Sequence, residues 1–141
     1  MKKIITTALT MLLLFQITSC SKDDTAQPTT HSVQGLWSGT LQHASAPSSQ
    51  FTMSIKGDGT ATYENIILGT QQFCSGTWTL SGTTFTCNTV CIYGLPGNVG
   101  VKQTFTAEFN TNSNTLGSGQ WVNTFPASTA NSGTFTLNTV N

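Results

Sequence analysis

The sequence predicts an all-β protein in which residues 34–141 form a single eight-stranded antiparallel up-and-down barrel. Three observations lead to this fold class. Apolar and polar residues alternate with a period of two, no apolar stripe recurs at helical spacing, and short turns rich in Gly and Asn separate the alternating segments. Because a meander of eight antiparallel strands removes its exposed edges by closing, we expect a barrel rather than an open sheet.

Tight turns separate several of the predicted strands. Ser-Gly at 81–82 is a two-residue hairpin signal, and Gly-Asp-Gly at 57–59 is a second short turn. Strands joined this tightly are expected to pair as antiparallel neighbours. In chain order the predicted strands cover 33–43, 50–56, 60–67, 71–80, 83–93, 101–109, 115–124 and 132–140.

The two faces of these strands differ in chemistry. The outward positions are mostly Thr, so the exterior faces water, whereas a barrel that crosses a membrane would carry an apolar band outside. In segment 115–124, Leu116 and Trp121 have opposite parity, and we expect a β-bulge at 117–119. The predicted inward set is Trp37, Leu41, Phe51, Met53, Ile55, Ala61, Tyr63, Trp78, Leu80, Phe85, Phe105, Ala107, Phe109, Phe135 and Leu137.

A short motif, Ser-Gly-Thr, recurs along the chain. It stands at 38–40, 75–77 and 132–134. A Gly inside a strand often marks a sharp bend or a close approach of another backbone. We therefore expect each of these Gly residues on the inner face, where the strands bend.

The lengths of the connections distinguish the two ends of the predicted barrel. One end carries the tight turns 57–59, 81–82 and 110–114. The other end carries the longer connections 44–50, 94–100 and 125–131, together with the short connection 68–70. The first end is expected to be closed and the second open.

Gly-Leu-Trp at 35–37 stands at the start of the first strand, near the closed end. This G-x-W resembles the first motif of the lipocalins and the wider calycin barrels. The resemblance implies that Trp37 plugs the barrel floor, where we also place Trp78. It further implies that a ligand enters at the end with the longer loops.

The inward positions near the open end define the candidate ligand site. A mostly apolar cavity with a few convergent polar groups is typical of small-ligand sites, so we expect a small apolar or amphipathic ligand. The alternative is a filled barrel whose loops bind a protein, as an inhibitor or an adhesion module. A void of about 300 Å³ or more would favour the ligand. The candidate ligand-binding residues are His43, Tyr63, Asn65, Gln72, Tyr93, Gln103, Trp121 and Asn123.

The sequence offers little support for catalysis or nucleic-acid binding. Asp58 lies in a turn, and Glu64 and Glu108 fall on the outward parity, so no carboxylate pair faces a cleft. His43 has no nucleophile and carboxylate to complete a triad. The chain contains no Arg, which argues against a phosphate-binding surface. We expect no enzyme activity, no cofactor and no nucleic-acid partner.

Three cysteines fall within the predicted barrel: Cys74, Cys87 and Cys91. With Ser-Gly at 81–82 as the turn, Cys74 faces Thr89, and the other two cysteines are its diagonal neighbours. A bulge or a different turn length would bring Cys74 to either of them. One disulfide or free buried thiols remain as interpretations. The C-x3-C spacing on a strand is unlike that of zinc sites, so we expect no metal.

The N-terminal residues indicate export. In residues 1–19, two lysines precede an apolar stretch that is shorter than the ~20 residues of a membrane-spanning helix. Ile-Thr-Ser-Cys at 17–20 resembles a lipobox, which implies cleavage before Cys20 and lipidation of its thiol, for example with palmitate. Residues 20–33 then form the lipidated end and a flexible tether to the barrel at 34–141.

Two further short motifs follow Cys20. Ser-Lys-Asp-Asp at 21–24 resembles the acidic signal that routes lipoproteins of the Bacteroidota to the cell surface. Asp-Thr-Ala, with Thr25 at its centre, resembles an O-glycosylation motif of the same bacteria. These resemblances imply an outer-membrane lipoprotein displayed at the cell surface and held by its lipid.

Overall fold

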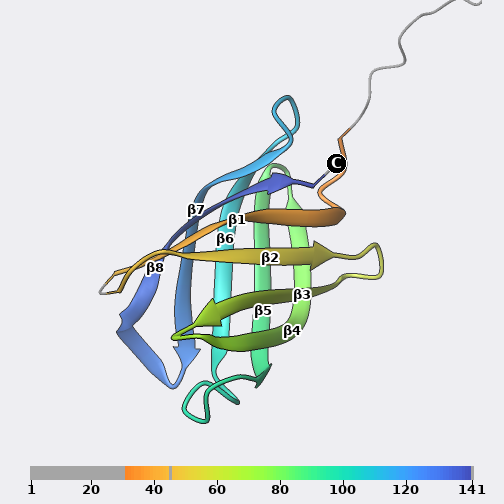
Figure 1. Ribbon diagram of the computed structural model, residues 1–141. Helices are drawn as coiled ribbons and strands as arrows, with labels where there is room; N and C mark the ends of the chain where they lie inside the picture. The colour runs from red at the N-terminus through yellow and green to blue at the C-terminus, as the bar shows by residue number, and fades with distance from the viewer. Residues whose placement is uncertain (1–30, 45, 141) are drawn as a thin grey trace, which may run out of the picture.

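The computed structural model describes residues 31–44 and 46–140, and these form one closed antiparallel barrel of eight strands in the order β1 to β8 (Figure 1). Each strand pairs with the next along the chain, and β8 closes the barrel against β1. The predicted fold class is therefore confirmed. The predicted signal peptide, Cys20 and Thr25 lie outside the described residues, as do the side chains of 127–130.

The strands lie close to their predicted positions, with shifts of a residue or two at most ends. Their bounds are β1 Gly35–His43, β2 Ser49–Ile55, β3 Thr60–Ile67, β4 Thr70–Ser81, β5 Thr84–Tyr93, β6 Lys102–Asn110, β7 Thr115–Phe125 and β8 Ala127–Thr139.

Sharp bends allow the barrel to close. Strands β1, β2 and β3 run across the direction of β5, β6 and β7, and β4 bends between the two groups (Figure 1). The Gly of each Ser-Gly-Thr motif lies where a neighbouring backbone passes very close. A Cβ on Gly76 would stand 1.8 Å from the carbonyl oxygen of Asn88, and Cβ atoms on Gly39 and Gly133 would meet backbone oxygens equally closely. These positions therefore require Gly.

The interior of the barrel is filled with side chains. Phe51, Phe105 and Phe135 pack against one another with ring centroids 5.6 to 6.3 Å apart, and Tyr63 joins them. Nearly all predicted inward residues are buried. Two depart from the prediction: Trp78 is only partly buried, and Leu80 is 38% exposed because it lies beside the turn where the barrel wall ends.

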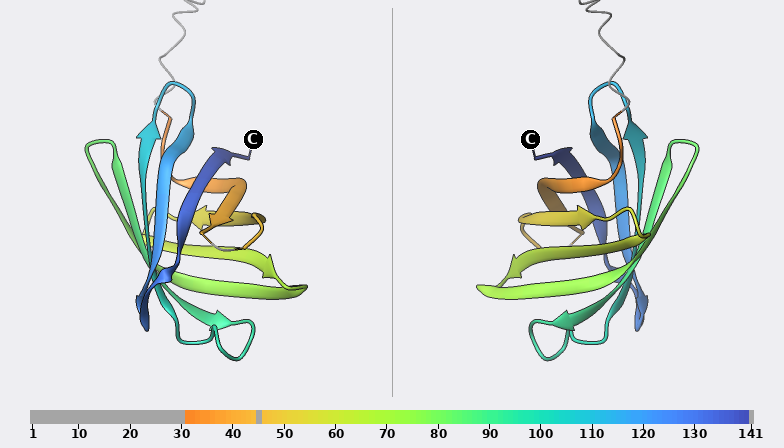
Figure 2. Two further views of the ribbon diagram at one scale, coloured as in Figure 1. Left: turned by 90° about the vertical axis from the view of Figure 1, so that its left-hand side faces the viewer. Right: turned by 90° about the vertical axis from the view of Figure 1, so that its right-hand side faces the viewer.

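The two ends of the barrel differ. Figure 2 shows the β4–β5 and β6–β7 turns at one end and the β5–β6 loop at the other. At the first, closed end, buried Val33 accepts a hydrogen bond from Trp37 Nε1 at 2.8 Å, and Trp37 meets Phe109 edge to face. The floor thus contains Trp37, and Trp78 donates nearby to the carbonyl of Lys56 at 2.8 Å.

Two predicted connections are wrong in detail. The residue pair between β4 and β5 is Gly82 and Thr83 rather than Ser81 and Gly82, since Ser81 pairs with Thr84. Gly82 adopts a positive φ of 61°, which suits Gly in a tight turn. The connection predicted at 125–131 is mostly strand, because β7 and β8 continue to pair almost to Pro126. The bulge predicted at 117–119 is confirmed by a register shift between Leu116 and Gly119.

Candidate functional site

The open end holds a small pocket of about 170 Å³, which we call the mouth pocket. It is formed by the inward side of several strand ends together with the β5–β6 loop. No charged side chain lies among its described lining residues. The lining residues are His43, Ile67, Gln72, Asn98, Val101, Gln103, Trp121, Asn123 and Asn131.

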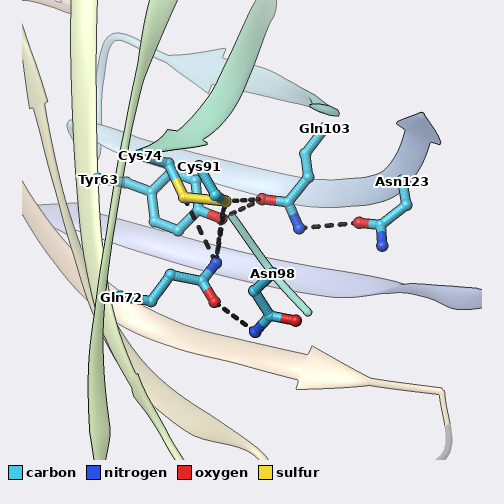
Figure 3. Close-up of a disulfide and its surroundings, with 7 residues drawn as sticks. All are labelled: Tyr63, Gln72, Cys74, Cys91, Asn98, Gln103 and Asn123. Atoms are coloured by element: carbon cyan, nitrogen blue, oxygen red, sulfur yellow. Dashed lines mark hydrogen bonds between the residues drawn. A yellow bond between two sulfur atoms is a disulfide. The ribbon is translucent and has the colours of Figure 1, made fainter. Parts of the chain in front are cut away.

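A disulfide joins Cys74 and Cys91 next to Gln72, which lines the mouth pocket (Figure 3). The expected pairing of Cys74 with Thr89 is wrong, because the turn lies one residue further along the chain and this shifts the pairing by two residues. Thr89 therefore pairs with Gly76, and Cys74 lies directly opposite Cys91. Both sulfur-bearing side chains are buried. The bond ties β4 to β5 at the point where the sheet reaches the mouth.

Amide side chains form a connected network beside the disulfide (Figure 3). Gln72 Nε2 donates to the hydroxyl of Tyr63 at 3.1 Å and to Cys91 Sγ at 3.1 Å. Asn98 Nδ2, from the β5–β6 loop, donates to Gln72 Oε1 at 2.8 Å. These bonds hold Gln72 in one orientation, so that the loop and β4 are linked across the mouth.

Gln103 extends the same network toward β7. Its Oε1 accepts a hydrogen bond from the Tyr63 hydroxyl, and its Nε2 donates to Asn123 Oδ1 at 2.9 Å. Tyr63 is buried, and desolvation raises the pKa of its hydroxyl well above the usual range. Tyr63 is therefore a neutral donor and acceptor that joins two amides below the pocket.

Asn65 lies within the barrel next to this network but takes no part in it. It pairs across the sheet with Gln72, and on its own strand it stands between Tyr63 and Ile67 on the same face. Only 4% of Asn65 is exposed, and neither atom of its side-chain amide has a hydrogen-bond partner among the described residues. A buried amide without a partner is costly, so this one needs an explanation.

His43 and Trp121 form the aromatic side of the mouth pocket. Their rings meet edge to face at 5.1 Å, and Trp121 Nε1 donates to the carbonyl of Gln42 at 3.1 Å. Partial burial lowers the pKa of His43, which favours the neutral imidazole. The aromatic wall therefore adds no charge to the pocket at neutral pH.

Tyr93 does not join the other predicted ligand-binding residues. The β4–β5 register shifts between Phe73 and Cys74, so that Tyr93 pairs with Phe73 and is 60% exposed. The extra residue at Ile92 is the physical reason, since a bulge turns the following side chain to the other face. Of the predicted set, five residues line the mouth pocket: His43, Gln72, Gln103, Trp121 and Asn123. Tyr63 is hydrogen-bonded to two of them, Asn65 is buried outside the lining, and Tyr93 is exposed.

Exposed apolar residues surround the open end, and the sequence reasoning missed most of them. They come from the end of β3, the β3–β4 turn, the end of β5, the β5–β6 loop and the end of β7. Leu68, in the turn, is 91% exposed. Apolar residues at turn positions, as in Leu-Gly at 68–69, were the signal available in the sequence. We call this set the open-end rim: Ile66, Leu68, Ile92, Tyr93, Val99 and Phe125.

Other features of the described residues are weaker candidates for a functional site than the mouth pocket and the open-end rim. A wider groove of about 420 Å³ crosses the outer faces of β1 to β4, but it is open and lined mainly by outward polar side chains. Cys87 is a buried free thiol, and burial raises its pKa to about 12, which keeps it protonated and unreactive. No cluster of three or more metal-binding side chains, and no helix able to span a membrane, occurs within 31–44 and 46–140.

Comparison with protein-family models, with curated proteins and with solved structures finds no match to this chain. The site is therefore interpreted from its own geometry.

Proposed function

We propose that the protein is a lipid-anchored, surface-displayed barrel that binds a partner protein through its open-end rim. The observation that carries this proposal is the concentration of exposed apolar side chains around one end of a barrel whose outer strand faces are mostly polar. Exposed apolar patches on soluble domains often mark interaction sites. Aromatic residues such as Tyr93 and Phe125 are typical anchors in such sites.

The filled interior favours a protein partner over the small apolar ligand expected from the sequence. Phe51, Phe105 and Phe135 occupy the centre of the barrel, where an apolar ligand would have to lie. The mouth pocket, at about 170 Å³, is smaller than the ~300 Å³ typical of such a ligand site. Its wall is also rich in amides, which an apolar molecule would leave unpaired.

The position of the tether supports the same proposal. The described chain begins at the closed end, where Val33 packs against Trp37. A lipid on Cys20 would therefore attach the barrel through its closed end. With a flexible tether between the lipid and the barrel, the open-end rim would stay accessible to a partner protein.

The charge of the barrel indicates the chemistry of the partner. Lys102 and Glu64, which are opposite in charge, lie beside the rim. The ammonium of Lys102 lies 5.8 Å from the ring of Phe125, and Glu64 stands two residues before Ile66 on the same face of β3. With so little charge nearby, electrostatic attraction contributes little to association. We expect a partner with an apolar, uncharged contact surface and an affinity that changes little with salt.

The experiment compares two matched double variants of the anchored protein. Leu68→Ser with Phe125→Ser alters the rim, and Leu36→Ser with Leu80→Ser alters exposed leucines at the closed end. A protein cross-linked to the wild type on intact cells is purified, and its affinity for each form is measured directly. The rim variant should bind at least about tenfold more weakly, and the closed-end variant should bind like the wild type.

Equal binding by the rim variant and the wild type would overturn the proposal. So would adsorption to phospholipid vesicles that the rim variant abolishes, because the rim would then be a lipid-binding surface. Melting temperatures of both variants show whether any loss of binding reflects unfolding.

A further inference from the structure

The mouth pocket offers hydrogen bonds without charge. Its polar wall consists of five amides and the imidazole of His43. The amides belong to Gln72, Asn98, Gln103, Asn123 and Asn131. A charged ligand placed here would lose hydration and find no opposite charge among the described lining residues. A wholly apolar ligand would separate these amides from water and form no hydrogen bonds with them. Both classes are disfavoured by the lining itself.

The internal hydrogen bonds of the pocket leave specific groups free for a ligand. Among the described residues, Asn98 uses its Nδ2 on Gln72, which leaves its Oδ1 as an acceptor. Asn123 uses its Oδ1 to accept from Gln103, which leaves its Nδ2 as a donor. Donors and acceptors thus lie together around a space whose volume equals that of roughly six water molecules.

Asn65 provides an independent observation that points to a ligand. Both atoms of its buried side-chain amide lack a partner, although Gln72, its neighbour across the sheet, is fully used by the network. Native proteins rarely leave such a group unpaired unless water or a ligand completes it. Ile67, the next residue on the same face of β3, lines the pocket, so Asn65 stands one position deeper on that face and outside the lining itself. Asn65 also borders the outer groove across β1 to β4.

The aromatic side of the pocket completes the chemical description. Trp121 and His43 line the pocket together with the amides and meet edge to face, and Trp121 Nε1 also donates to the carbonyl of Gln42. A ligand suited to this pocket therefore has C–H groups on one side and groups that both donate and accept on the other. Hydroxyl groups do both, so a ring that bears several of them fits the free donors and acceptors in either orientation.

We infer that the mouth pocket binds one neutral sugar ring, either a free monosaccharide or the terminal residue of a glycan, and that Asn65 is the hydrogen-bonding residue at its base. The floor is rigid, since the Cys74–Cys91 disulfide and Tyr63 hold Gln72 from below. The pocket is distinct from the open-end rim, so the two sites can be tested separately.

The test uses the full lipoprotein in phospholipid nanodiscs, with saturation-transfer NMR as the readout. The probes are glucose, galactose, mannose and N-acetylglucosamine as neutral sugars, glucuronate as a charged analogue, and octanol as an apolar probe. At least one neutral sugar should show saturation transfer, with an affinity at least about tenfold above those of glucuronate and octanol. A glycan that ends in the same sugar should bind at least as well if the natural source is a glycan.

Variants show whether the sugar uses this pocket. Asn65→Leu removes the unpaired amide at nearly constant shape, so it should weaken sugar binding at least about tenfold without lowering the melting temperature. Asn123→Ala, at the less buried side of the pocket, provides a second variant. Asn112→Leu, in the exposed β6–β7 turn, is the matched control and should bind like the wild type.

Three results would overturn the inference. The first is the absence of saturation transfer to all of the neutral sugars at high millimolar concentration. The second is tighter binding of octanol or glucuronate than of any neutral sugar. The third is unchanged sugar affinity in both Asn65→Leu and Asn123→Ala, which would place the sugar elsewhere and leave Asn65 to water.

Discussion

At the scale of single residues, three glycines determine how the barrel bends. Gly39, Gly76 and Gly133 each stand where the carbonyl oxygen of a neighbouring strand would meet a Cβ at 1.8 to 1.9 Å. No rotamer change can relieve such a contact, because the obstructing atom belongs to the backbone. The repeated Ser-Gly-Thr motif thus reflects a packing requirement that recurs on three different strands.

Replacing Gly76 tests this requirement. Gly76→Ala should lower the free energy of unfolding by ~3 kcal/mol or more, since the new methyl group forces the β4 and β5 backbones apart. Gly117→Ala is the matched control, because a Cβ at that position meets nothing within 4 Å. Urea unfolding of both variants measures the effect. Similar stabilities for the two would contradict the requirement.

His43 gives the barrel a predictable dependence on pH. Desolvation lowers the pKa of His43 in the folded protein below its value of about 6.5 in the unfolded chain. As the pH falls through about 6.5, the unfolded state therefore binds more protons than the folded state, and stability decreases. It stops decreasing once the pH is below the folded pKa.

The measurement compares the melting temperatures of the wild type and His43→Gln across this range. The wild type should lose stability between about pH 7.5 and pH 5, and the variant should lose less, because Gln does not titrate. Parallel curves for the two proteins would show that His43 makes no contribution. The slopes are compared, since loss of the contact with Trp121 also changes absolute stability.

At the scale of elements, the β4–β5 hairpin shows what the sequence can and cannot reveal. Alternation of apolar and polar residues predicts both strands, because burial of one face requires it. The register depends on which two residues form the turn, and Ser-Gly and Gly-Thr are both acceptable there. That single ambiguity decides whether Cys74 faces Thr89 or Cys91, so the disulfide partner could not be predicted from spacing alone.

Regular strand alternation also explains which residues of the mouth pocket could be predicted from the sequence and which could not. Inward parity correctly indicates that Gln72, Gln103, Trp121 and Asn123 converge, since each lies on a regular stretch of strand. Tyr93 was misplaced because the bulge before it has no Gly or Pro to reveal it. Asn98 and Asn131, which lie in segments expected to be loops, were missed because strand periodicity does not extend into loops.

The disulfide predicts a measurable stabilisation of this hairpin. Its cysteines are 17 residues apart, and closure of a loop of this length stabilises a protein by ~3 kcal/mol in the chain-entropy model. The double variant Cys74→Ala with Cys91→Ala should therefore unfold at lower urea concentration. A reductant should lower the wild-type midpoint toward the same value and leave the variant unchanged. No effect of either treatment would contradict a stabilising role.

At the scale of the whole molecule, the filled barrel would be attached through its closed end and would bind its partner at its open end under the proposed function. The anchor is the part predicted from sequence alone. In Cys20→Ala the lipid acceptor is lost, so the protein should move from the membrane fraction to the soluble fraction, because stable anchoring takes two acyl chains and the variant carries none. Unchanged fractionation would refute lipidation at Cys20.

The rim gives the most direct test of the proposed function, through a photo-crosslinking amino acid placed at single positions in the anchored protein on intact cells. The account predicts that position 68 in the rim yields a discrete adduct with a partner protein, which the unlabelled soluble form competes away. Position 80, an exposed leucine at the closed end, should yield none. Adducts of equal intensity at both positions, or adducts with lipid alone at position 68, would contradict protein binding through the open-end rim.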